Sequence, residues 1–491
     1  MNDIEHLYVY VCLFEFHLFH DSYYNQAAGV IQPERMKEMT KKSIVEADLE
    51  ARSPWSSYKD KQEVILSPPT TAVNASITIP GSKSLTNRAL LLAAMAKGTT
   101  QIEGLLKGDD SYWCINILKQ LGVHVEIQGE SATVEGINGE WPNRTGELYV
   151  GAAGTVARFL PGLLAAGQGL WRMTGSHRMS ERPLAPLLYQ LAAMGGVFTY
   201  ERIEGQLPYT LEAKGLQGGE PVLAGSISSQ FISGLLMAAP YAEQTLRLSI
   251  DGPIVQREYV EMTLEMMRKF GADSNVEDEG QVITILPNGY QAPSAAIVLE
   301  PDVSTCCYFW ALAALTNGRI RVEGISLRTL QPDMEMVHVL EKMGCSMVHG
   351  ENYVEVTGTN QLKGGFTLSM KRWSDQTLTM AVLAIFADGP ITFTDAAHIR
   401  HHECDRISAI CTELIKMGIQ VEEHPDGLTV YPGIPQSALL DPHDDHRMAM
   451  ALSLIGVKVP HIRIANPGCV SKTCPDYYER MEALGLKVSW L

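Results

Sequence analysis

The sequence predicts an α/β protein with two similar domains that face each other across a cleft. Three observations lead to this prediction. A short helix ending recurs six times, its copies follow one another at a nearly constant spacing, and a Pro-containing boundary divides them three and three. The 491 residues are 45% hydrophobic and 19% charged, which supplies the apolar sequence that two sizeable cores need.

The recurring ending consists of two apolar residues three positions apart, followed at once by glycine. The copies are Leu118–Leu121–Gly122, Leu191–Met194–Gly195, Met267–Phe270–Gly271, Leu340–Met343–Gly344, Leu414–Met417–Gly418 and Met481–Leu484–Gly485. Successive glycines are 73, 76, 73, 74 and 67 residues apart. Glycine suits the positive φ that ends many helices, and a strand-like alternation follows most copies. The chain therefore repeats a unit of helix, glycine and strand.

A unit of about 70 residues has room for two helices and three or four strands, and it gains most by packing against its copies. The boundary between the third and fourth units lies near Glu300–Pro301–Asp302, and Pro80–Gly81 marks a second crossing between domains. We expect one domain at 82–300 and another formed by 63–81 plus 301–491. A ligand site is expected in the cleft between them.

The first 62 residues differ from the rest, because an aromatic and His-rich start gives way to a charged, polar stretch. We expect residues 1–62 to be a poorly ordered extension outside the fold, with Met36 as an alternative start. The apolar run Leu7–Phe14 is too short to cross a membrane and lacks the basic flank of a signal peptide. Nine scattered cysteines without a CxxC pair favour a reducing compartment, so we expect a cytoplasmic protein.

The net charge is strongly acidic: 39 Lys and Arg against 56 Asp and Glu give −17. Such a chain repels nucleic acid and anionic membranes, so neither is expected as a partner. A small anionic ligand remains compatible with this charge if a local basic pocket binds it.

The segment 80–88 combines a helix start with basic side chains. Lys83 and the backbone amides of the following helix form a candidate anion site, and Ser84 and Arg88 share one helix face. The upstream glycine of a Walker A loop is absent. An ordinary helix cap with solvated charges is the alternative interpretation.

A second polar helix start lies at 226–231, where Ser228, Ser229 and Gln230 precede an apolar run. Two adjacent hydroxyls and an amide can bind a phosphate or a polyol without adding charge. Helix capping explains one serine, but it does not obviously explain two serines together with Gln230.

Four arginines stand in similar polar settings, namely Arg178, Arg182, Arg406 and Arg447. Planar guanidinium groups match carboxylates and phosphates bidentately, so arginines that converge on a cleft would hold a doubly anionic ligand. A structural ion pair is the alternative for each of them.

A run of metal-binding residue types lies at 398–404, namely His398, His401, His402, Glu403 and Cys404. The HExxH pattern is absent and no second ligand cluster follows at a standard spacing, so we expect no metal. Glu403 and, upstream, Asp375 are instead the carboxylates best placed for proton transfer in a cleft.

From about Val64 to its end, the chain resembles the 5-enolpyruvylshikimate-3-phosphate synthase family, also called 3-phosphoshikimate 1-carboxyvinyltransferase. The resemblance rests on GSKSLTNRALLLAA, GAAGT, HRMSERP, SISSQF, the region of Asp375, ECDR, DDHRMAM and SKTCPDYYERM, which follow the family's order. It implies an inside-out α/β fold of two domains with three βαβαββ repeats each. It also implies enolpyruvyl transfer from phosphoenolpyruvate to the 5-hydroxyl of shikimate 3-phosphate, with phosphate released and without metal or organic cofactor. We expect a monomer.

The resemblance also implies roles for individual residues. The phosphoenolpyruvate-binding set is Lys83, Gly154, Arg178, Gln230, Arg406, Arg447 and Lys472. The shikimate-3-phosphate set is Lys83, Ser84, Arg88, Ser228, Ser229, Gln230, Asp375 and His402. The expected catalytic groups are Asp375, which would accept the proton of the attacking hydroxyl, and Glu403 with Lys83, which would protonate the methylene carbon.

Four positions depart from the family's pattern. His402 replaces a usual Lys, His398 an Asn and Gln256 a Ser on the acceptor side, and Ala152 replaces the Asn of GNAGT. We expect a protonated His402 or the neighbouring Arg257 to supply the missing charge. Because the loop with Ala152 also meets glyphosate in this family, we expect weak glyphosate inhibition.

Three other functions remain open. UDP-N-acetylglucosamine enolpyruvyl transferase shares the fold, but the GSKS…NR and SSQF combination argues against it. A family member acting on another cyclic alcohol phosphate would account for the acceptor-side departures. A non-catalytic substrate-binding paralogue is disfavoured because Asp375, Glu403 and Lys472 are all present.

Overall fold

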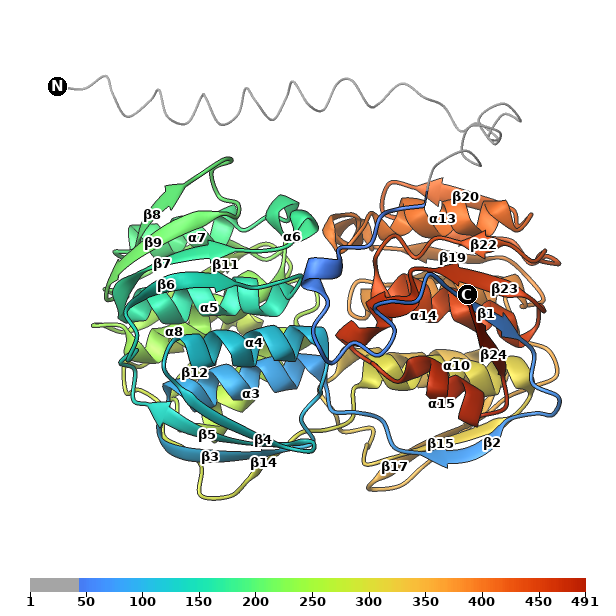
Figure 1. The fold of residues 1–491 in the computed structure, drawn as a ribbon, viewed down its shortest axis with the longest axis horizontal. Helices are drawn as coiled ribbons and strands as arrows, with labels where there is room; N and C mark the ends of the chain where they lie inside the picture. Colours follow the sequence, from blue (N-terminus) through green and yellow to red (C-terminus); the bar gives the residue numbers. More distant parts are fainter. Residues whose placement is uncertain (1–43) are drawn as a thin grey trace. The chain divides into compact units, whose positions relative to one another are not determined.

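The computed structural model describes residues 44–491. Within these residues the strands form six four-stranded sheets. Three sheets use strands between 97 and 298, and three use strands at 63–77 and 319–490 (Figure 1). We call residues 82–300 the first lobe and residues 63–81 plus 301–491 the second lobe. The predicted α/β fold class is confirmed.

Each sheet is built from one βαβαββ unit, as the family resemblance implies. One example is β6 (Thr145–Tyr149), α5 (Gly154–Ala166), β7 (Gln168–Thr174), α7 (Ala185–Ala193), β8 (Val197–Tyr200) and β9 (Tyr209–Lys214), with the short α6 (His177–Glu181) before α7. The strand order is β6-β7-β9-β8. The pair β6–β7 is parallel, and β9 is antiparallel to both β7 and β8.

Two further units follow the chain in the same way. In the first lobe these elements are β10 (Val222–Ala224), α8 (Ser229–Ala238), β11 (Leu246–Asp251), α9 (Glu258–Lys269), β12 (Ser274–Glu277) and β13 (Val282–Ile285). In the second lobe they are β18 (Phe366–Ser369), α12 (Thr377–Ile385), β19 (Ile391–Thr394), α13 (Arg406–Lys416), β20 (Val421–His424) and β21 (Gly427–Val430).

The other three units each take one strand from a distant part of the chain. In the first lobe, β14 (Ile297–Val298) completes the unit of α3 (Lys83–Met95), β3 (Lys97–Glu103), α4 (Asp109–Gln120), β4 (His124–Gln128) and β5 (Ser131–Ile137). In the second lobe, β2 (Asn74–Ile77) completes the unit of α10 (Val303–Thr316), β15 (Arg319–Glu323), α11 (Glu335–Lys342), β16 (Ser346–His349) and β17 (Tyr353–Thr357).

The last unit contains β22 (Leu439–Leu440), α14 (His446–Ser453), β23 (Ile462–Ala465), α15 (Tyr477–Ala483) and β24 (Lys487–Trp490). Its remaining strand, β1 (Glu63–Ser67), lies between β23 and β24. The chain thus enters the second lobe, crosses to the first and returns. The two crossings lie together, because Gly81 pairs with Pro301 and the Ser82 amide donates to the Glu300 carbonyl at 2.8 Å.

The six glycines of the recurring ending all have positive φ. The angles are 89° at Gly122, 117° at Gly195, 81° at Gly271, 100° at Gly344, 82° at Gly418 and 99° at Gly485. Each glycine follows one of the helices α4, α7, α9, α11, α13 and α15, and each precedes a strand. The predicted unit of helix, glycine and strand is confirmed.

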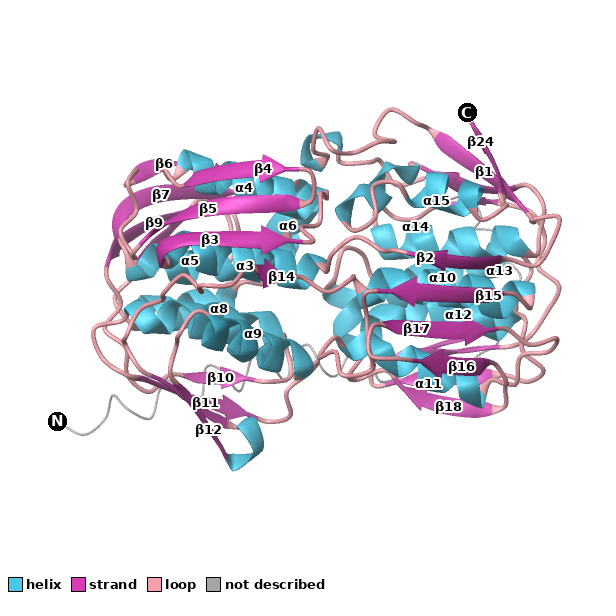
Figure 2. Ribbon diagram, turned by 90° about the horizontal axis from the view of Figure 1, so that it is seen from below, coloured by secondary structure: helices cyan, strands magenta, loops and turns pink. Residues whose placement is uncertain are grey.

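The helices at the centre of each lobe are buried around most of their circumference. Every residue of α12 and of α14 is buried, and α5 is buried from Gly154 to Ala165. Their sheets lie outside them, as Figure 2 shows for β2, β15, β17 and β16. One apolar core runs from Ala89 to Leu299, and the other combines residues 58–79 with 303–486. The two cores are separate clusters of buried residues.

Residues 44–62 belong to the packed structure, although they fall within the extension that the sequence places outside the fold. Ala51 and Tyr58 are buried, and the Tyr58 ring stacks on Trp490 at 4.8 Å between centroids. The segment is charged and polar on average, so its composition gives no indication that a few apolar residues pack against the core. The alternative start Met36 lies outside the described residues.

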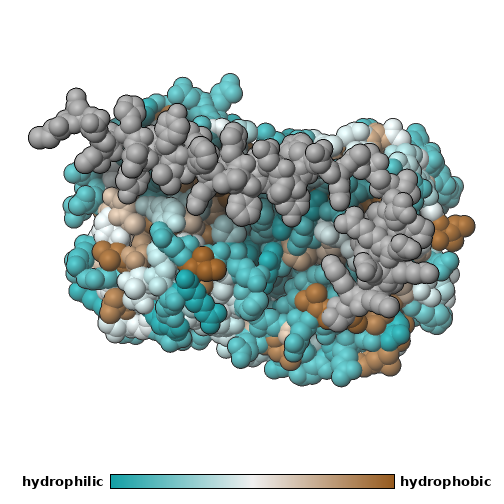
Figure 3. All heavy atoms as spheres, turned by 90° about the horizontal axis from the view of Figure 1, so that it is seen from above, coloured by the Kyte–Doolittle hydropathy of each residue, from teal (hydrophilic) through white to brown (hydrophobic). Residues whose placement is uncertain are grey.

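The outer surface is predominantly hydrophilic on the face seen in Figure 3, where hydrophobic residues are scattered. No helix within residues 44–491 is long and apolar enough to cross a membrane.

Candidate active site

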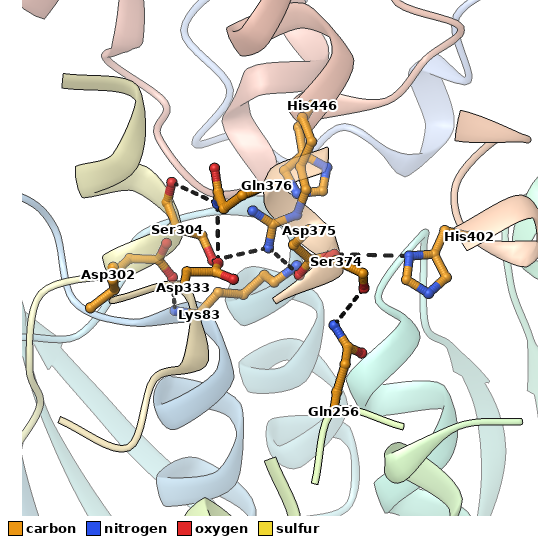
Figure 4. Close-up of polar contacts among 12 residues, drawn as sticks. Lys83, Gln256, Asp302, Ser304, Asp333, Ser374, Asp375, Gln376, His402 and His446 are labelled. Atoms are coloured by element: carbon orange, nitrogen blue, oxygen red, sulfur yellow. Dashed lines mark hydrogen bonds and ion pairs between the residues drawn. The ribbon is translucent and has the colours of Figure 1, made fainter. Parts of the chain in front are cut away.

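Most of the predicted site residues gather where the two lobes meet. A pocket there is lined by residues of both lobes, among them Arg158, Arg182, Ser228, Gln230 and Gln256 from the first lobe and His398, His401 and His402 from the second. Figure 4 shows polar side chains of the two lobes beside one another, with Lys83 and Gln256 of the first lobe near Asp375 and Ser374 of the second.

Helix starts position the polar residues of the first lobe. Lys83 is the first residue of α3, and its amide donates to Asp302 Oδ2 at 3.0 Å. Ser228 is the N-cap of α8 and accepts from the Gln230 amide at 3.2 Å, so the capping alternative holds for Ser228. Gln230 reaches across to Arg158, whose Nη1 donates to Gln230 Oε1 at 2.9 Å.

Gly154 begins α5 at a point where a side chain would not fit. A Cβ at this residue would lie 2.9 Å from Arg158 Nη1 and 2.9 Å from Arg182 Nη1. Glycine therefore allows two guanidinium groups to approach the start of one helix. Arg158 and Arg182 both line the pocket; the sequence singled out Arg182 as a candidate arginine, but it gave no indication of Arg158. Arg182 lies within the HRMSERP motif, and Arg158 is four residues after Gly154.

Arg406 is the centre of the charged network in the second lobe. It is 1% exposed, and its Nε donates to Asp445 Oδ2 at 2.7 Å. Its Nη1 donates to Asp375 Oδ1 at 2.8 Å, and its Nη2 donates to Glu403 Oε2 at 3.0 Å. Both predicted catalytic carboxylates are therefore held by the same guanidinium.

Glu403 contacts cations of both lobes. Lys472 Nζ lies 2.7 Å from Glu403 Oε1, and Arg182 Nη1 of the first lobe lies 3.6 Å from the same oxygen. Burial alone would raise the pKa of Glu403, but Lys472, Arg182 and Arg406 hold it well below its usual range. Glu403 is therefore ionised at neutral pH in this arrangement.

Asp375 has a similar environment. Arg447 Nη2 lies 2.7 Å from Asp375 Oδ2, opposite the contact with Arg406. Burial opposes ionisation, but Arg447 and Arg406 hold the pKa of Asp375 well below that of an ordinary carboxyl group. Arg447 Nη1 is buried and has no hydrogen-bond partner among the described residues. A donor in this state is available to an anionic ligand.

A third carboxylate, Asp110, lies between two predicted lysines. Asp110 Oδ2 is 3.8 Å from Lys83 Nζ, and Asp110 Oδ1 is 3.9 Å from Lys472 Nζ. Burial raises the pKa of Asp110 and lowers that of Lys83. Sequence reasoning missed Asp110; the available signal was the acidic start of α4 directly after Gly108.

Two predicted arginines lie in unexpected settings. Arg178 donates from Nε to the Glu403 carbonyl at 2.9 Å and from Nη2 to the His402 carbonyl at 3.0 Å, so it joins the lobes. Arg88 is buried and donates to Thr263 Oγ1 at 2.8 Å and to the Ser84 carbonyl at 3.0 Å. Arg88 is not among the residues that line the pocket and instead ties α3 to α9.

The three acceptor-side departures form one connected group. Gln256 Nε2 donates to Ser374 Oγ at 3.0 Å, and Ser374 Oγ lies 2.7 Å from His398 Nε2. The rings of His398 and His402 meet edge to face at 5.8 Å between centroids. Gln256 and His398 are thereby linked through a single serine across the two lobes.

Neither histidine supplies the positive charge expected on the acceptor side. Burial lowers the pKa of His398 to about 4, and burial with the nearby Arg406 keeps the pKa of His402 well below its ordinary value. Arg406 Nη1 lies 3.0 Å from His402 Nδ1 and can only donate, so the proton of the neutral ring is on Nε2. Arg257 pairs with Glu261 at 3.0 Å and does not line the pocket.

The side chains of His398 and His402 in the run 398–404 contact Ser374 and Arg406. Within residues 44–491, no group of three or more His, Cys, Asp or Glu side chains is arranged to hold a metal ion.

Comparison with known proteins gives a consistent result. A sequence model of the family described as EPSP synthase (3-phosphoshikimate 1-carboxyvinyltransferase) matches residues 68–481. A protein of Halalkalibacterium halodurans named 3-phosphoshikimate 1-carboxyvinyltransferase 2 is 50% identical over 446 residues, which cover 90% of this chain and 99% of that protein. A 3-phosphoshikimate 1-carboxyvinyltransferase of Nostoc punctiforme is 42% identical over 410 residues, 83% of this chain and 96% of that protein.

A solved structure is also similar. The EPSP synthase of Acinetobacter baumannii superposes with a TM-score of 0.73 at 26% identity, and the match covers 87% of this chain and all of that one.

Proposed function

The chain belongs to the EPSP synthase family, and on that premise we propose how its site transfers the enolpyruvyl group of phosphoenolpyruvate to the 5-hydroxyl of shikimate 3-phosphate, releasing phosphate. The protein is an enzyme, a transferase of the shikimate pathway. The observation that most directly supports the site is the group of buried cations around two ionised carboxylates at the lobe junction.

We assign phosphoenolpyruvate to the cations of this group. Its carboxylate and phosphate need several donors, and those of Arg447, Arg406 and Lys472 lie around Asp375 and Glu403. Arg447 Nη1, which is buried without a partner among the described residues, is a donor that such an anion satisfies. Lys83, Gly154, Arg178 and Gln230 complete the proposed set.

We assign shikimate 3-phosphate to the pocket side of the site. Ser228 and Gln230 line the pocket at the start of α8, and His402 offers its Nε2 proton there. Ser229, between Ser228 and Gln230, is buried and completes the set at this helix start. Lys83, Ser84 and Asp375 complete the proposed contacts. Arg88 donates to the Ser84 carbonyl and so holds the backbone at Ser84 in place.

The reaction proceeds by addition and elimination. The 5-hydroxyl oxygen bonds to C2 of phosphoenolpyruvate while a proton adds to C3, and then the C2–O bond to phosphate breaks as C3 loses a proton. Asp375 accepts the hydroxyl proton, and Glu403 with Lys83 moves the proton at C3. The surrounding cations stabilise the negative charge of the tetrahedral adduct and of the leaving phosphate.

Substrate binding changes the basicity of both carboxylates. In the described arrangement Arg406 and Arg447 hold Asp375 ionised and weakly basic. When the anionic groups of phosphoenolpyruvate bind these guanidinium groups, Asp375 shares its counter-ions and gains negative neighbours, so its pKa rises. The same argument applies to Glu403 beside Lys472, which must be protonated before it can act as an acid.

We also propose how the molecule is organised around this reaction. Separate cores and segregated sheets support two domains, at 82–300 and at 63–81 plus 301–491. We also propose a monomer without a nucleic-acid partner, because the net charge of −17 opposes binding to nucleic acid. All eight cysteines within residues 44–491 are free, as in a cytoplasmic protein.

The test of the function is phosphate release by the purified protein with phosphoenolpyruvate and shikimate 3-phosphate, each omitted in turn. Release that requires both substrates is expected. Release that is absent with shikimate 3-phosphate but present with another cyclic alcohol phosphate would overturn the acceptor. The neutral His398 and His402 are the observation that favours this second candidate, because they leave the acceptor side less basic.

A further inference from the structure

Residues 44–58 connect the two lobes outside the matched family region, which begins at residue 68. We call this segment the interlobe strap. In Figure 1 it is the dark blue segment between the two sets of sheets. None of its residues belongs to the substrate sets proposed above, so its contacts need a separate explanation.

The strap is bonded to the second lobe by polar groups. The Val45 amide donates to Asp441 Oδ2 at 2.7 Å, and Asn466 Nδ2 donates to the Val45 carbonyl at 3.0 Å. The Asp48 amide donates to Asp444 Oδ2 at 3.3 Å. The Arg52 guanidinium also forms an ion pair with Asp444.

The same short segment is bonded to the first lobe. The His177 amide, one residue before Arg178, donates to Asp48 Oδ2 at 3.3 Å. Trp113 Nε1 of α4 donates to the Ala51 carbonyl at 2.9 Å. Arg52 Nη1 lies 3.9 Å from Asp109 Oδ2, so one buried guanidinium faces a carboxylate of each lobe.

The contact with Asp109 leads directly to the proposed catalytic lysines. The Ser53 amide donates to Asp109 Oδ1 at 2.8 Å, and Ser471 Oγ donates to Asp109 Oδ2. Ser471 precedes Lys472, and the next residue after Asp109 is Asp110, which lies between Lys83 and Lys472.

The start of α4 is also pressed against the backbone of the second lobe. A Cβ at Gly108 would lie 2.7 Å from the Lys472 carbonyl oxygen. Because Asp110 follows Gly108 at the start of α4, a displacement of α4 against the second lobe changes the distance between Asp110 and Lys472. A group that fixes the junction therefore fixes the spacing of the cations.

We propose that the interlobe strap positions Lys83 and Lys472 for phosphoenolpyruvate, with Arg52 as the positioning residue that joins Asp109 to Asp444. The proposal rests on the proposed transfer reaction. Arg52 does not touch the substrates; it acts by holding the lobes at the spacing in which the two lysines share one anion.

The experiment compares Arg52→Met and Arg52→Lys with the unchanged full-length protein. Arg52→Met should raise KM for phosphoenolpyruvate and lower kcat/KM for it about ten- to a hundredfold, the cost of a small misplacement of binding groups. KM for shikimate 3-phosphate should change less than threefold.

Arg52→Lys should recover part of the lost kcat/KM, as should added guanidinium ion with Arg52→Met. Lys59→Ala, an exposed cation next to the strap, is the matched control and should match the unchanged protein.

Loss of Arg52 leaves the buried Asp109 and the half-buried Asp444 without the cation they share, so a folding defect must be separated from mispositioning. The double variant Arg52→Met/Asp444→Asn removes one of these charges. If it folds and still has the raised KM for phosphoenolpyruvate, the positioning role holds; if it regains normal kinetics, the proposal is overturned. Equal KM values for Arg52→Met and the unchanged protein would also overturn it.

Calorimetric binding of phosphoenolpyruvate separates the strap from the reaction. If the unchanged protein binds phosphoenolpyruvate without releasing phosphate, the proposed function fails while the strap is still tested by the change in Kd on Arg52→Met. A Kd that rises at least tenfold supports the strap, and an unchanged Kd contradicts it.

Discussion

At the scale of single residues, the site has a high density of buried charge held in balance. Asp375 and Asp110 each face two cations and Glu403 faces three, so every one of these carboxylates is compensated before any ligand arrives. Anionic substrates compete with these carboxylates for the same cations. The affinity for phosphoenolpyruvate and the basicity of Asp375 are consequently linked.

The neutral His398 predicts acid sensitivity of the fold. Its pKa of about 4 lies below the value of about 6.5 in an unfolded chain. Between these values the unfolded chain binds an extra proton, so the free energy of unfolding falls as pH decreases from about 6.5 towards 4, at up to about 1.4 kcal/mol per pH unit. Urea unfolding should show that His398→Asn loses less free energy of unfolding between pH 7 and pH 5 than the unchanged protein does. His349→Asn, at an exposed position, should not alter the loss; equal pH dependence in all three would contradict the prediction.

Substitution of Gln256 and of its neighbour Arg257 should have different effects on KM for shikimate 3-phosphate. Gln256→Ala removes a hydrogen bond to Ser374 at the pocket wall, and a loss of about 1 kcal/mol should raise KM for shikimate 3-phosphate about fivefold. Arg257→Ala should leave this KM within twofold, because the guanidinium pairs with Glu261. Steady-state kinetics gives KM for shikimate 3-phosphate in both variants and shows which residue contributes to acceptor binding. A larger effect of Arg257→Ala would restore the expectation drawn from the sequence that Arg257 supplies the missing charge.

At the scale of elements, helix starts place many of the polar site residues, and glycines at helix ends mark the repeated units. Sequence spacing predicted the helix ends, because a glycine with positive φ is a local requirement that leaves a local signal. The exchange of β1, β2 and β14 between distant units left no such signal. These strands are two to five residues long, and their partners lie far away in the sequence.

The same distinction applies to the site. Lys83, Arg406, Arg447 and Lys472 belong to motifs, and the structure brings their charges together around Asp110, Asp375 and Glu403. Asp110, Arg158 and the strap could not be predicted from motifs, because their positions depend on how α4, α5 and residues 44–58 pack. The neutral state of His402 also depends on tertiary structure, since burial and the adjacent Arg406 determine it.

The start of α5 provides a test at this scale. Gly154→Ala would place a methyl group 2.9 Å from the guanidinium groups of Arg158 and Arg182, which must then move. We expect KM for phosphoenolpyruvate to rise about tenfold, the cost of displaced binding groups. Gly146→Ala in β6 is the control, because its Cβ would meet nothing within 4 Å. If the two variants have the same KM, the start of α5 is not part of the phosphoenolpyruvate site.

At the scale of the whole molecule, the lobes differ in how the chain builds them. The first lobe is continuous from 82 to 300, whereas the second needs β1 and β2 from residues 63–77. We expect residues 82–300 to unfold cooperatively when produced alone and residues 301–491 to remain unfolded. Joining 63–81 to 301–491 by a short linker should restore folding, because Gly81 and Pro301 are adjacent. Circular dichroism melts of the three fragments test this, and a folded fragment 301–491 would contradict it.

The strand exchange has a consequence for the order in which the protein matures on the ribosome. Strand β1 is synthesised about 400 residues before its partners: Glu63 pairs with Ala465, and Val64 pairs with Trp490. During that interval the first lobe is completed and can fold as a unit, while β1 and β2 stay without their sheets. The second lobe closes only after the chain has passed through the first, so the two halves of the cleft are assembled in a fixed sequence.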